Sequence, residues 1–299
     1  MYFGSTRVAR RVLLTTVSAA ALAFVVNDQA GAQNVTPAWW GSIEGQYNWV
    51  QGDALDIDTS ADSLSLEPEN GYAGRVHLGG RFGNGWSAAI GLRYGMTDKE
   101  RDSAYSSFYG SDVEGSYEED HLVLDLEIGR DVGIGNGGNA RVFGGLRFAR
   151  FDGDGNLSVS GAGGEYYSSF EADTEHRFTG FGPRIGVDAA IPVATNVQVD
   201  ISAAGAALYG KRKFSVDFSY MSSGGSVSNY GGSESKHVIV PSVEARVALT
   251  YQLGQSASVS AGYKAEQFWN IMPATNNFGV SGENRLIHGP FLELKIFGN

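Results

Sequence analysis

The residues best suited to chemistry in this sequence are histidines that lie close to carboxylates. Asp120 directly precedes His121, Asp173 lies three positions before His176, and His237 follows in a polar stretch. A histidine held by a carboxylate can serve as the general base that activates water for peptide hydrolysis. These residues would form a protease site only if the fold brought them together at one edge of the molecule.

Other motifs with chemical meaning are sparse. Ser235 lies two residues before His237, a nucleophile and a base that a lipid acylase or deacylase would need, although this spacing is common by chance. The chain contains no Cys, and its five His form neither HExxH nor another metal-binding spacing. The sequence therefore predicts no enzyme activity, no catalytic residues, no cofactor and no metal site.

The composition narrows the class of protein. The chain has 299 residues, a net charge of −11, 42 Gly and only 18% charged residues. An apolar content of 42%, with 12% aromatic residues, is too high for a disordered chain. The acidic balance argues against a nucleic-acid partner, because phosphate backbones attract basic proteins.

The first 32 residues have the pattern of a secretory signal peptide. Three Arg between positions 7 and 11 precede an apolar run over residues 12–26, and Ala30-Gly31-Ala32 provides the small residues of a cleavage site. The apolar run is too short for a transmembrane anchor. We therefore expect residues 1–32 to direct export and residues 33–299 to form the mature domain.

The mature chain consists of stretches in which apolar and mixed side chains alternate. In residues 121–129, for example, Leu or Ile occupies every even position, while Asp125 and Glu127 lie between them. This period of two is typical of β-strands with one apolar face and one mixed face. Ten strands are predicted, at residues 39–49, 72–82, 86–97, 121–129, 141–148, 181–189, 197–209, 242–251, 258–266 and 291–297.

A soluble sandwich with inward apolar faces would show the same alternation, so other features must decide which way the faces point. The predicted strands are about as long as the 9–11 residues that a tilted membrane strand needs. Short connections such as 83–85 alternate with long ones near 51–71, 98–120, 152–176, 211–236 and 270–285. Outer-membrane barrels have this alternation, together with aromatic residues near the strand ends.

These features predict an all-β fold, a transmembrane antiparallel up-and-down β-barrel of about ten strands. Its apolar faces would meet lipid, with long loops outside and short turns in the periplasm. A hairpin at residues 214–230 could supply two further strands and give twelve, and a count of eight is the other alternative.

The mixed faces would line the inside of this barrel, where their acids and bases are nearly balanced. Because eight strands are just filled by their own side chains, a ten-strand lumen should be narrow. The charges could form a salt-bridged polar core or line a wet pore. The lumen- and pore-lining candidates are Arg75, Arg93, Asp125, Glu127, Arg147, Arg184, Asp200, Glu244, Arg246 and Lys264.

The long connections hold most of the negative charge. Residues 51–71 carry six acids and no Lys or Arg. We interpret these loops as solvated surface, with weak binding of divalent cations beside lipopolysaccharide phosphates as an alternative, since such cations prefer carboxylate oxygens. Residues 152–156 come closest to a calcium loop but lack its distal Glu.

Several segments rich in Gly and aromatic residues follow one another in a recognisable order. They are Trp39-Trp40-Gly41-Ser42-Ile43-Glu44-Gly45, Leu78-Gly79-Gly80-Arg81-Phe82, Gly91-Leu92-Arg93-Tyr94, Phe143-Gly144-Gly145-Leu146-Arg147 and Phe181-Gly182-Pro183-Arg184-Ile185-Gly186. Together they resemble the pore-forming major outer-membrane proteins typified by those of Legionella, over about residues 39–297. The resemblance implies an outer-membrane β-barrel with porin activity and a surface-exposed role, and it implies no catalytic residues.

We therefore expect a protein of the bacterial outer membrane, inserted by the barrel-assembly machinery among lipid and lipopolysaccharide. Its leading predicted function is a narrow porin-like channel for passive diffusion of small solutes or ions. The main alternative is a structural or adhesive surface barrel with a salt-bridged, plugged lumen. An omptin-like rim protease, using the aspartates and histidines named above, is a third hypothesis.

Overall fold

The structure is a computed structural model that describes residues 38–52, 55–58, 63–106, 111–133, 138–160, 167–222, 225–276 and 279–298. The strands are β1 (Trp39–Gln51), β2 (Leu55–Asp58), β3 (Ser63–Leu66), β4 (Gly71–Phe82), β5 (Trp86–Thr97), β6 (Glu100–Ser106), β7 (Ser111–Gly133), β8 (Asn139–Ser160), β9 (Tyr167–Ala194), β10 (Val197–Ser222), β11 (Val227–Gln252), β12 (Ala257–Asn276) and β13 (Gly279–Gly298). None of the described segments is a helix long and apolar enough to cross a membrane. The predicted signal peptide lies outside the described residues.

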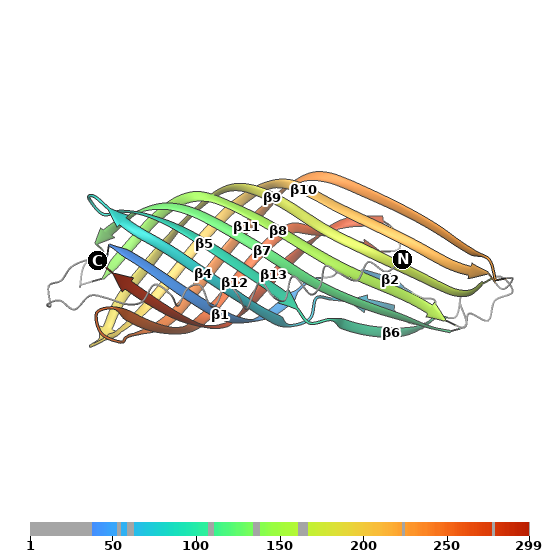
Figure 1. The fold of residues 1–299 in the computed structure, drawn as a ribbon, viewed down its shortest axis with the longest axis horizontal. Coiled ribbons are helices and arrows are strands. Elements are labelled where there is room, and N and C mark those ends of the chain that lie inside the picture. The colour runs from blue at the N-terminus through green and yellow to red at the C-terminus, as the bar shows by residue number, and fades with distance from the viewer. Residues whose placement is uncertain are drawn as a thin grey trace.

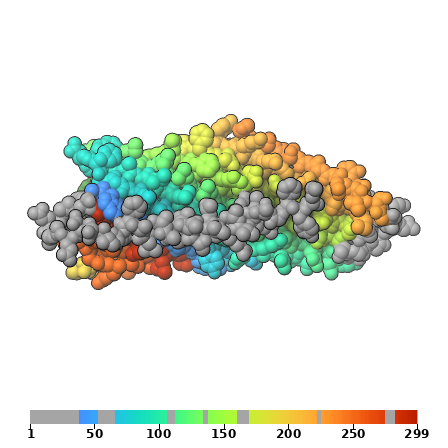
Figure 2. Space-filling model, in the orientation of Figure 1, coloured from blue at the N-terminus to red at the C-terminus, as the bar shows by residue number. Residues whose placement is uncertain are grey.

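Ten of the strands close into a ring (Figure 1), and Figure 2 shows that the closed body is elongated. Each ring strand is antiparallel to both neighbours, in the order β1, β4, β5, β7, β8, β9, β10, β11, β12 and β13. β13 then returns to β1, where Ile43 lies opposite Leu294 and Val50 opposite Ile287. Closure pairs backbone groups that lipid could not satisfy. The predicted ten-strand up-and-down barrel is confirmed.

The apolar faces of the ring strands point outward. Leu126 on β7 and Ile185 on β9 expose 46% and 69% of their surface, whereas the adjacent Asp125 and Arg184 expose 5% and 2%. Exposed aromatic side chains flank this apolar band at both ends. Trp39, Phe82 and Trp86 lie at the end with the short turns, and Tyr72, Phe181 and Tyr209 lie at the other end. This is the lipid-facing arrangement of an outer-membrane barrel.

The short turns are built from residues that tolerate positive φ. Gly83, Asn84 and Gly85 connect β4 to β5 with φ values of 26°, 52° and 79°. Asn196, with φ of 63°, turns the chain from β9 into β10. Gly and Asn adopt this region with the least strain. These turns lie at the same end as the C-terminus (Figure 1), which we take as the periplasmic end.

At the extracellular end the strands continue beyond the apolar band. β10 and β11 stay paired from Val197 opposite Tyr251 up to Met221 opposite Val227. The long connections predicted at 152–176 and 211–236 are present at this end, and most of their residues continue the paired strands. The hydrogen bonds between strand backbones do not require an apolar face. Segments rich in Ser, Gly and acidic residues can therefore continue the strand pairing in water. The 214–230 hairpin extends β10 and β11, and the ring keeps ten strands.

Three short strands lie outside the ring at this extracellular end. β6 pairs with the outer part of β7, β2 pairs with β3, and Leu55 of β2 meets Thr275 of β12. Leu66 at the end of β3 is fully buried and packs against Tyr117 and Leu157, which point into the barrel from β7 and β8. The end of β3, part of the connection between β1 and β4, therefore packs against the mouth of the barrel.

Candidate functional site

Charged side chains from the mixed faces meet inside the barrel and form an ionic network. Arg147 on β8 donates two hydrogen bonds to Asp125 on β7, over 2.6 and 2.9 Å. The same guanidinium bonds Glu244 of β11 over 2.9 Å and also contacts Glu266 of β12, across the lumen. A planar guanidinium suits several carboxylates at once, because its donors are fixed in a fork. Arg147 thus connects opposite walls of the barrel.

The carboxylates around Arg147 have further basic partners. Arg93 on β5 pairs with Glu266. Glu244 lies 3.3 Å from Arg184 of β9 and 3.5 Å from Lys264 Nζ of β12. Buried charges are tolerated only when they are paired and hydrogen-bonded. The near-balance of acids and bases that the sequence indicated is therefore realised as direct ion pairs.

A second group of ion pairs lies nearer the periplasmic end. Arg141 on β8 donates to Glu127 over 3.0 Å. Arg246 on β11 lies 3.5 Å from Glu44 of β1 and 2.5 Å from Glu293 of β13. The first pair joins the neighbouring strands β7 and β8, whereas the pairs of Arg246 join strands that are distant in the sequence, so the ring is cross-linked at a second level.

The structure brings together most of the predicted lining residues. Eight of them take part in these ion pairs: Arg93, Asp125, Glu127, Arg147, Arg184, Glu244, Arg246 and Lys264. Asp200 instead accepts hydrogen bonds from Gln198 and Thr250, over 2.7 and 2.5 Å. Arg75 lies beside Gly91 of the neighbouring strand, where an added Cβ atom would come within 3.4 Å of its Nη2 atom.

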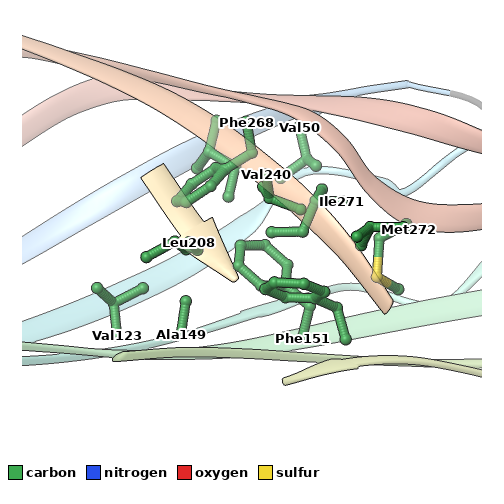
Figure 3. Packing of buried hydrophobic residues seen from close by; sticks show 12 residues of the cluster. Val50, Val123, Ala149, Phe151, Leu208, Val240, Phe268, Ile271 and Met272 are labelled. Carbon is green, nitrogen blue, oxygen red and sulfur yellow. The ribbon is translucent and has the colours of Figure 1, made fainter. Parts of the chain in front are cut away.

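Toward the extracellular end, the next layer of the lumen is filled by apolar side chains (Figure 3). We call it the lumen plug, and its twelve buried members are Val50, Val123, Ala149, Phe151, Phe178, Leu208, Val238, Val240, Phe268, Ile271, Met272 and Ile287. The plug draws on β1 and on every ring strand from β7 to β13. Phe151 and Phe268 meet edge to face with ring centroids 5.0 Å apart. The sequence predicted a narrow lumen lined by charges, as a polar core or a wet pore, and did not predict this apolar layer.

A bulge in β12 provides two neighbouring members of the plug. The register between β12 and β13 shifts between Phe268 and Met272, and Asn270 has a φ of 58°. As a result the consecutive side chains of Ile271 and Met272 are both fully buried, although side chains normally alternate between faces. Arg212 of β10, two strands away in the ring, donates to Asn270 Oδ1 over 2.5 Å and holds the bulge in place.

A buried polar group lies above the plug, in the mouth of the barrel. Arg285 of β13 donates to Glu119 over 2.9 Å, and the Tyr117 hydroxyl donates to the same carboxylate over 3.0 Å. His176 packs edge-on against Tyr117, with its Nδ1 atom 2.5 Å from the carbonyl oxygen of Pro273. Burial lowers the pKa of His176 to about 4, which the hydrogen bond to Pro273 only partly opposes. The ring is therefore neutral at pH 7 and donates from Nδ1.

The residues considered for a rim enzyme are not brought together. His121 is buried inside the barrel, whereas the adjacent Asp120 lies on the opposite face of β7. Asp173 and His176 also lie on opposite faces of β9, because they are three residues apart. His237 is exposed on the outer face of β11. None of these pairs shares a site on the described strands.

The acidic residues show no arrangement for metal binding within the described part of the chain, which has no group of three or more His, Cys, Asp or Glu able to hold an ion. Residues 152–156 form part of strand β8. Asp152 is occupied by Arg150 and Arg177, which donate to it over 2.6 and 2.5 Å. Cation binding by the acidic connections stays a prediction, since part of residues 51–71 lies outside the described ranges.

Solved structures resemble this fold at low sequence identity. The outer membrane protease OmpT from Escherichia coli matches with a TM-score of 0.51 and 12% identity, over 89% of this chain and 99% of that chain. A major outer membrane protein from Thermus thermophilus gives 0.37 and 12%, over 87% and 100% of the two chains. The Pseudomonas putida toluene transporter TodX gives 0.40 and 9%, over 88% and 91%. At 12% identity, the match to OmpT shows a shared fold and nothing more.

The family of this chain is identified from its sequence. No curated protein matches the chain. The sequence pattern of the Legionella pneumophila major outer membrane protein precursor matches residues 19–298, which is nearly the whole chain. Together with the closed ring and its outward apolar band, this match shows that the chain belongs to the Legionella major outer membrane protein family and is a β-barrel of the bacterial outer membrane.

Proposed function

We propose that this protein is a structural surface barrel whose lumen is closed at rest and which presents long extracellular hairpins. The observation that carries the proposal is the lumen plug, a layer of twelve apolar side chains on the extracellular side of the ionic network. The alternative of a salt-bridged, plugged barrel therefore has more support than an open channel.

Side chains that line an aqueous path must be accessible to water. Arg147 and Lys264 expose only 1% and 2% of their surface, and eight plug residues expose none. An ion entering the plug would lose its hydration without gaining polar partners, which costs several kcal/mol or more. These values support a barrel that does not conduct in the conformation described here.

The extracellular extensions support a role at the cell surface. β9 and β10 contain 28 and 26 residues, whereas about 9–11 suffice to cross the hydrocarbon. More than half of each strand therefore lies outside the apolar core of the membrane. Because these extensions remain hydrogen-bonded to their neighbours, they form a stiff polar surface that could hold a partner without the cost of ordering a loop.

Conductance across a planar lipid bilayer tests the proposal directly. We expect no discrete current steps from purified protein whose folding has been verified by heat-modifiable migration in gel electrophoresis. An open porin inserted into the same bilayer is the positive control for the assay. Reproducible single-channel steps from the folded wild-type protein at low voltage would contradict the closed lumen.

A narrow porin-like channel for passive diffusion of small solutes or ions is the second candidate, and the bulge in β12 favours it. Ile271 and Met272 enter the plug through a local irregularity and not through a regular ladder. Displacing this short segment would remove two bulky side chains and open the ionic network to water. The lining charges would then face the permeating solute.

The double variant Ile271→Ala/Met272→Ala separates the two candidates. A gated channel predicts frequent current steps in this variant and rare ones in the wild type. Ile239→Ala is the matched control, because Ile239 exposes 64% of its surface on the lipid face and lies outside the plug. A folded double variant that is as silent as the control would refute the channel.

A further inference from the structure

Four basic side chains gather on the outer surface of the barrel near its extracellular end. Arg150 of β8, Arg177 of β9, and Lys211 and Lys213 of β10 lie on the outward faces of three adjacent strands. Lys213 lies directly opposite Arg177, while Lys211 and Arg150 flank Thr179 from its two sides. We call these four side chains the basic patch. Figure 2 shows the strands that carry it, coloured from green through yellow to orange, as one continuous outer surface.

The basic patch begins where the lipid-facing band ends. Phe148, Phe181 and Tyr209 lie opposite one another in a single row across the same three strands. Phe181 and Tyr209 expose 64% and 57% of their surface, as expected for side chains at the edge of the hydrocarbon. The first basic row is two residues further along each strand, about 7 Å at the usual rise. The patch therefore lies at the height of the headgroups of the outer leaflet.

The charge of the patch is only partly neutralised. Asp152 accepts hydrogen bonds from Arg150 and Arg177, and these two Arg side chains still expose 39% and 43% of their surface. Lys211 and Lys213 have no carboxylate within 4.0 Å among the residues that the structure describes. Further acids nearby are Asp120 of β7, opposite Asp152, and Glu175 of β9, opposite Ser215, and His237 lies beside Lys211. Asp154 of β8, opposite Glu175, also lies on the extracellular side of the patch, so the bases lie on the side nearest the lipid-facing band and the acids mostly beyond them.

We infer that the basic patch binds the phosphate groups of lipid A, the acylated anchor of lipopolysaccharide in the outer leaflet. The ligand must carry several anionic groups at the height of the patch and acyl chains against the aromatic row below it. Phosphates suit both kinds of base, since Arg offers a planar fork and Lys a point charge. The patch spans three strands, about 10 Å at the usual strand spacing, which fits the separated phosphates of one glycolipid better than a single phosphodiester. Asp152 keeps the two arginines oriented toward the ligand.

Binding to defined lipids tests this site. The full-length mature barrel in a neutral detergent is titrated with hexa-acylated lipid A that carries both phosphates, and bound lipid is counted by native mass spectrometry. The test variant is Lys211→Gln/Lys213→Gln. The matched control, Lys99→Gln/Arg101→Gln, removes the same charge from two exposed positions, Lys99 just before β6 and Arg101 on β6. Heat-modifiable migration verifies that each variant has folded.

We expect the test variant to bind lipid A about thirtyfold more weakly, since each surface base contributes about a fivefold factor near anionic lipid. The control should stay within about twofold. Wild-type binding should weaken with added salt and nearly vanish for dephosphorylated lipid A. These wild-type measurements keep the inference testable even if the test variant fails to fold.

Three outcomes would overturn the inference. Equal affinity of the folded test and control variants would show that the patch does not hold the lipid. Equal binding of dephosphorylated lipid A would show that only the acyl chains are recognised. Equal binding of phosphatidylglycerol vesicles, or displacement of lipid A by inorganic phosphate at similar concentrations, would show a general anion site in place of a glycolipid site.

Discussion

Arg147→Met is the substitution that most sharply distinguishes a dry lumen from a wet one. The change removes a guanidinium that bonds Asp125, Glu244 and Glu266 and leaves a side chain of similar length. Three carboxylates then share fewer positive partners: Arg93 remains for Glu266, while Arg184 and Lys264 remain for Glu244. Asp125 loses its two short hydrogen bonds, and within the described part of the chain Arg184, 3.8 Å away, is the ion-pair partner that it keeps.

The expected loss of stability follows from the burial of the ionic network. Arg147 exposes 1% of its surface, and its three carboxylate partners expose no more than 5%. Removing one partner from such a buried group costs about 3–5 kcal/mol, because charges are left without compensation. If water filled the lumen, the same pairs would be worth no more than about 1 kcal/mol, as exposed ion pairs are. The two states of the lumen therefore predict clearly different stabilities.

Urea unfolding of the barrel in lipid vesicles, followed by tryptophan fluorescence, measures this difference. Arg147→Met should lower the free energy of unfolding by about 3–5 kcal/mol, and adding Glu266→Gln should restore part of it by rebalancing the charges. The exposed Arg101→Met serves as control and should change stability by less than about 0.5 kcal/mol. A loss below about 1 kcal/mol for Arg147→Met, or a double variant as unstable as the single one, would refute the dry network.

Three further predictions can be checked in the same unfolding assay. Leu126→Arg puts a charge at mid-depth on the lipid face and should lower the free energy of unfolding by about 2–4 kcal/mol. An unchanged free energy of unfolding would contradict the placement of Leu126 against lipid. Gly79→Ala would place a Cβ atom 2.1 Å from the Trp40 ring and should lower the free energy of unfolding by about 1–3 kcal/mol. In the control Gly45→Ala the added Cβ atom has no atom within 4 Å, so the free energy of unfolding should change by less than about 0.5 kcal/mol. The pKa of His176 is about 4 when folded against the usual 6.5, so the unfolded chain takes up the proton first. Stability should therefore fall, by at most about 3 kcal/mol, as the pH drops from about 6.5 to about 4, and His176→Gln should show less of this dependence.

Much of the barrel could be predicted because its signals are local. The alternation over 121–129 identified β7 and placed Leu126 and Asp125 on opposite faces, as the structure has them. Strand number followed from counting such segments, and Asn84 between two glycines marked a tight turn. These properties depend on residues next to one another in the chain, so no knowledge of the partner strands was needed.

The lumen plug could not be predicted in the same way because its contacts cross the barrel. Val123 lies between His121 and Asp125 on the mixed face, so alternation alone gives no reason to separate it from the polar side chains around it. Its apolar surroundings come from Leu208, Val240 and other strands distant in sequence. The bulge that buries Ile271 and Met272 together breaks the period of two by which strands are recognised in the sequence.

The plug and the ionic network depend on each other, and this dependence links stability to function. Arg147 and Ala149 are two residues apart on the same inward face of β8, so an ion pair lies directly beneath an apolar contact. While the plug excludes water, the pairs below it act at low dielectric and hold the opposite walls together. Opening the bulge of β12 would admit water, weaken those pairs and loosen the walls at the same moment. A gated channel of this construction must therefore lose stability when it opens, whereas a surface barrel that never opens keeps the full strength of the network at the membrane midplane.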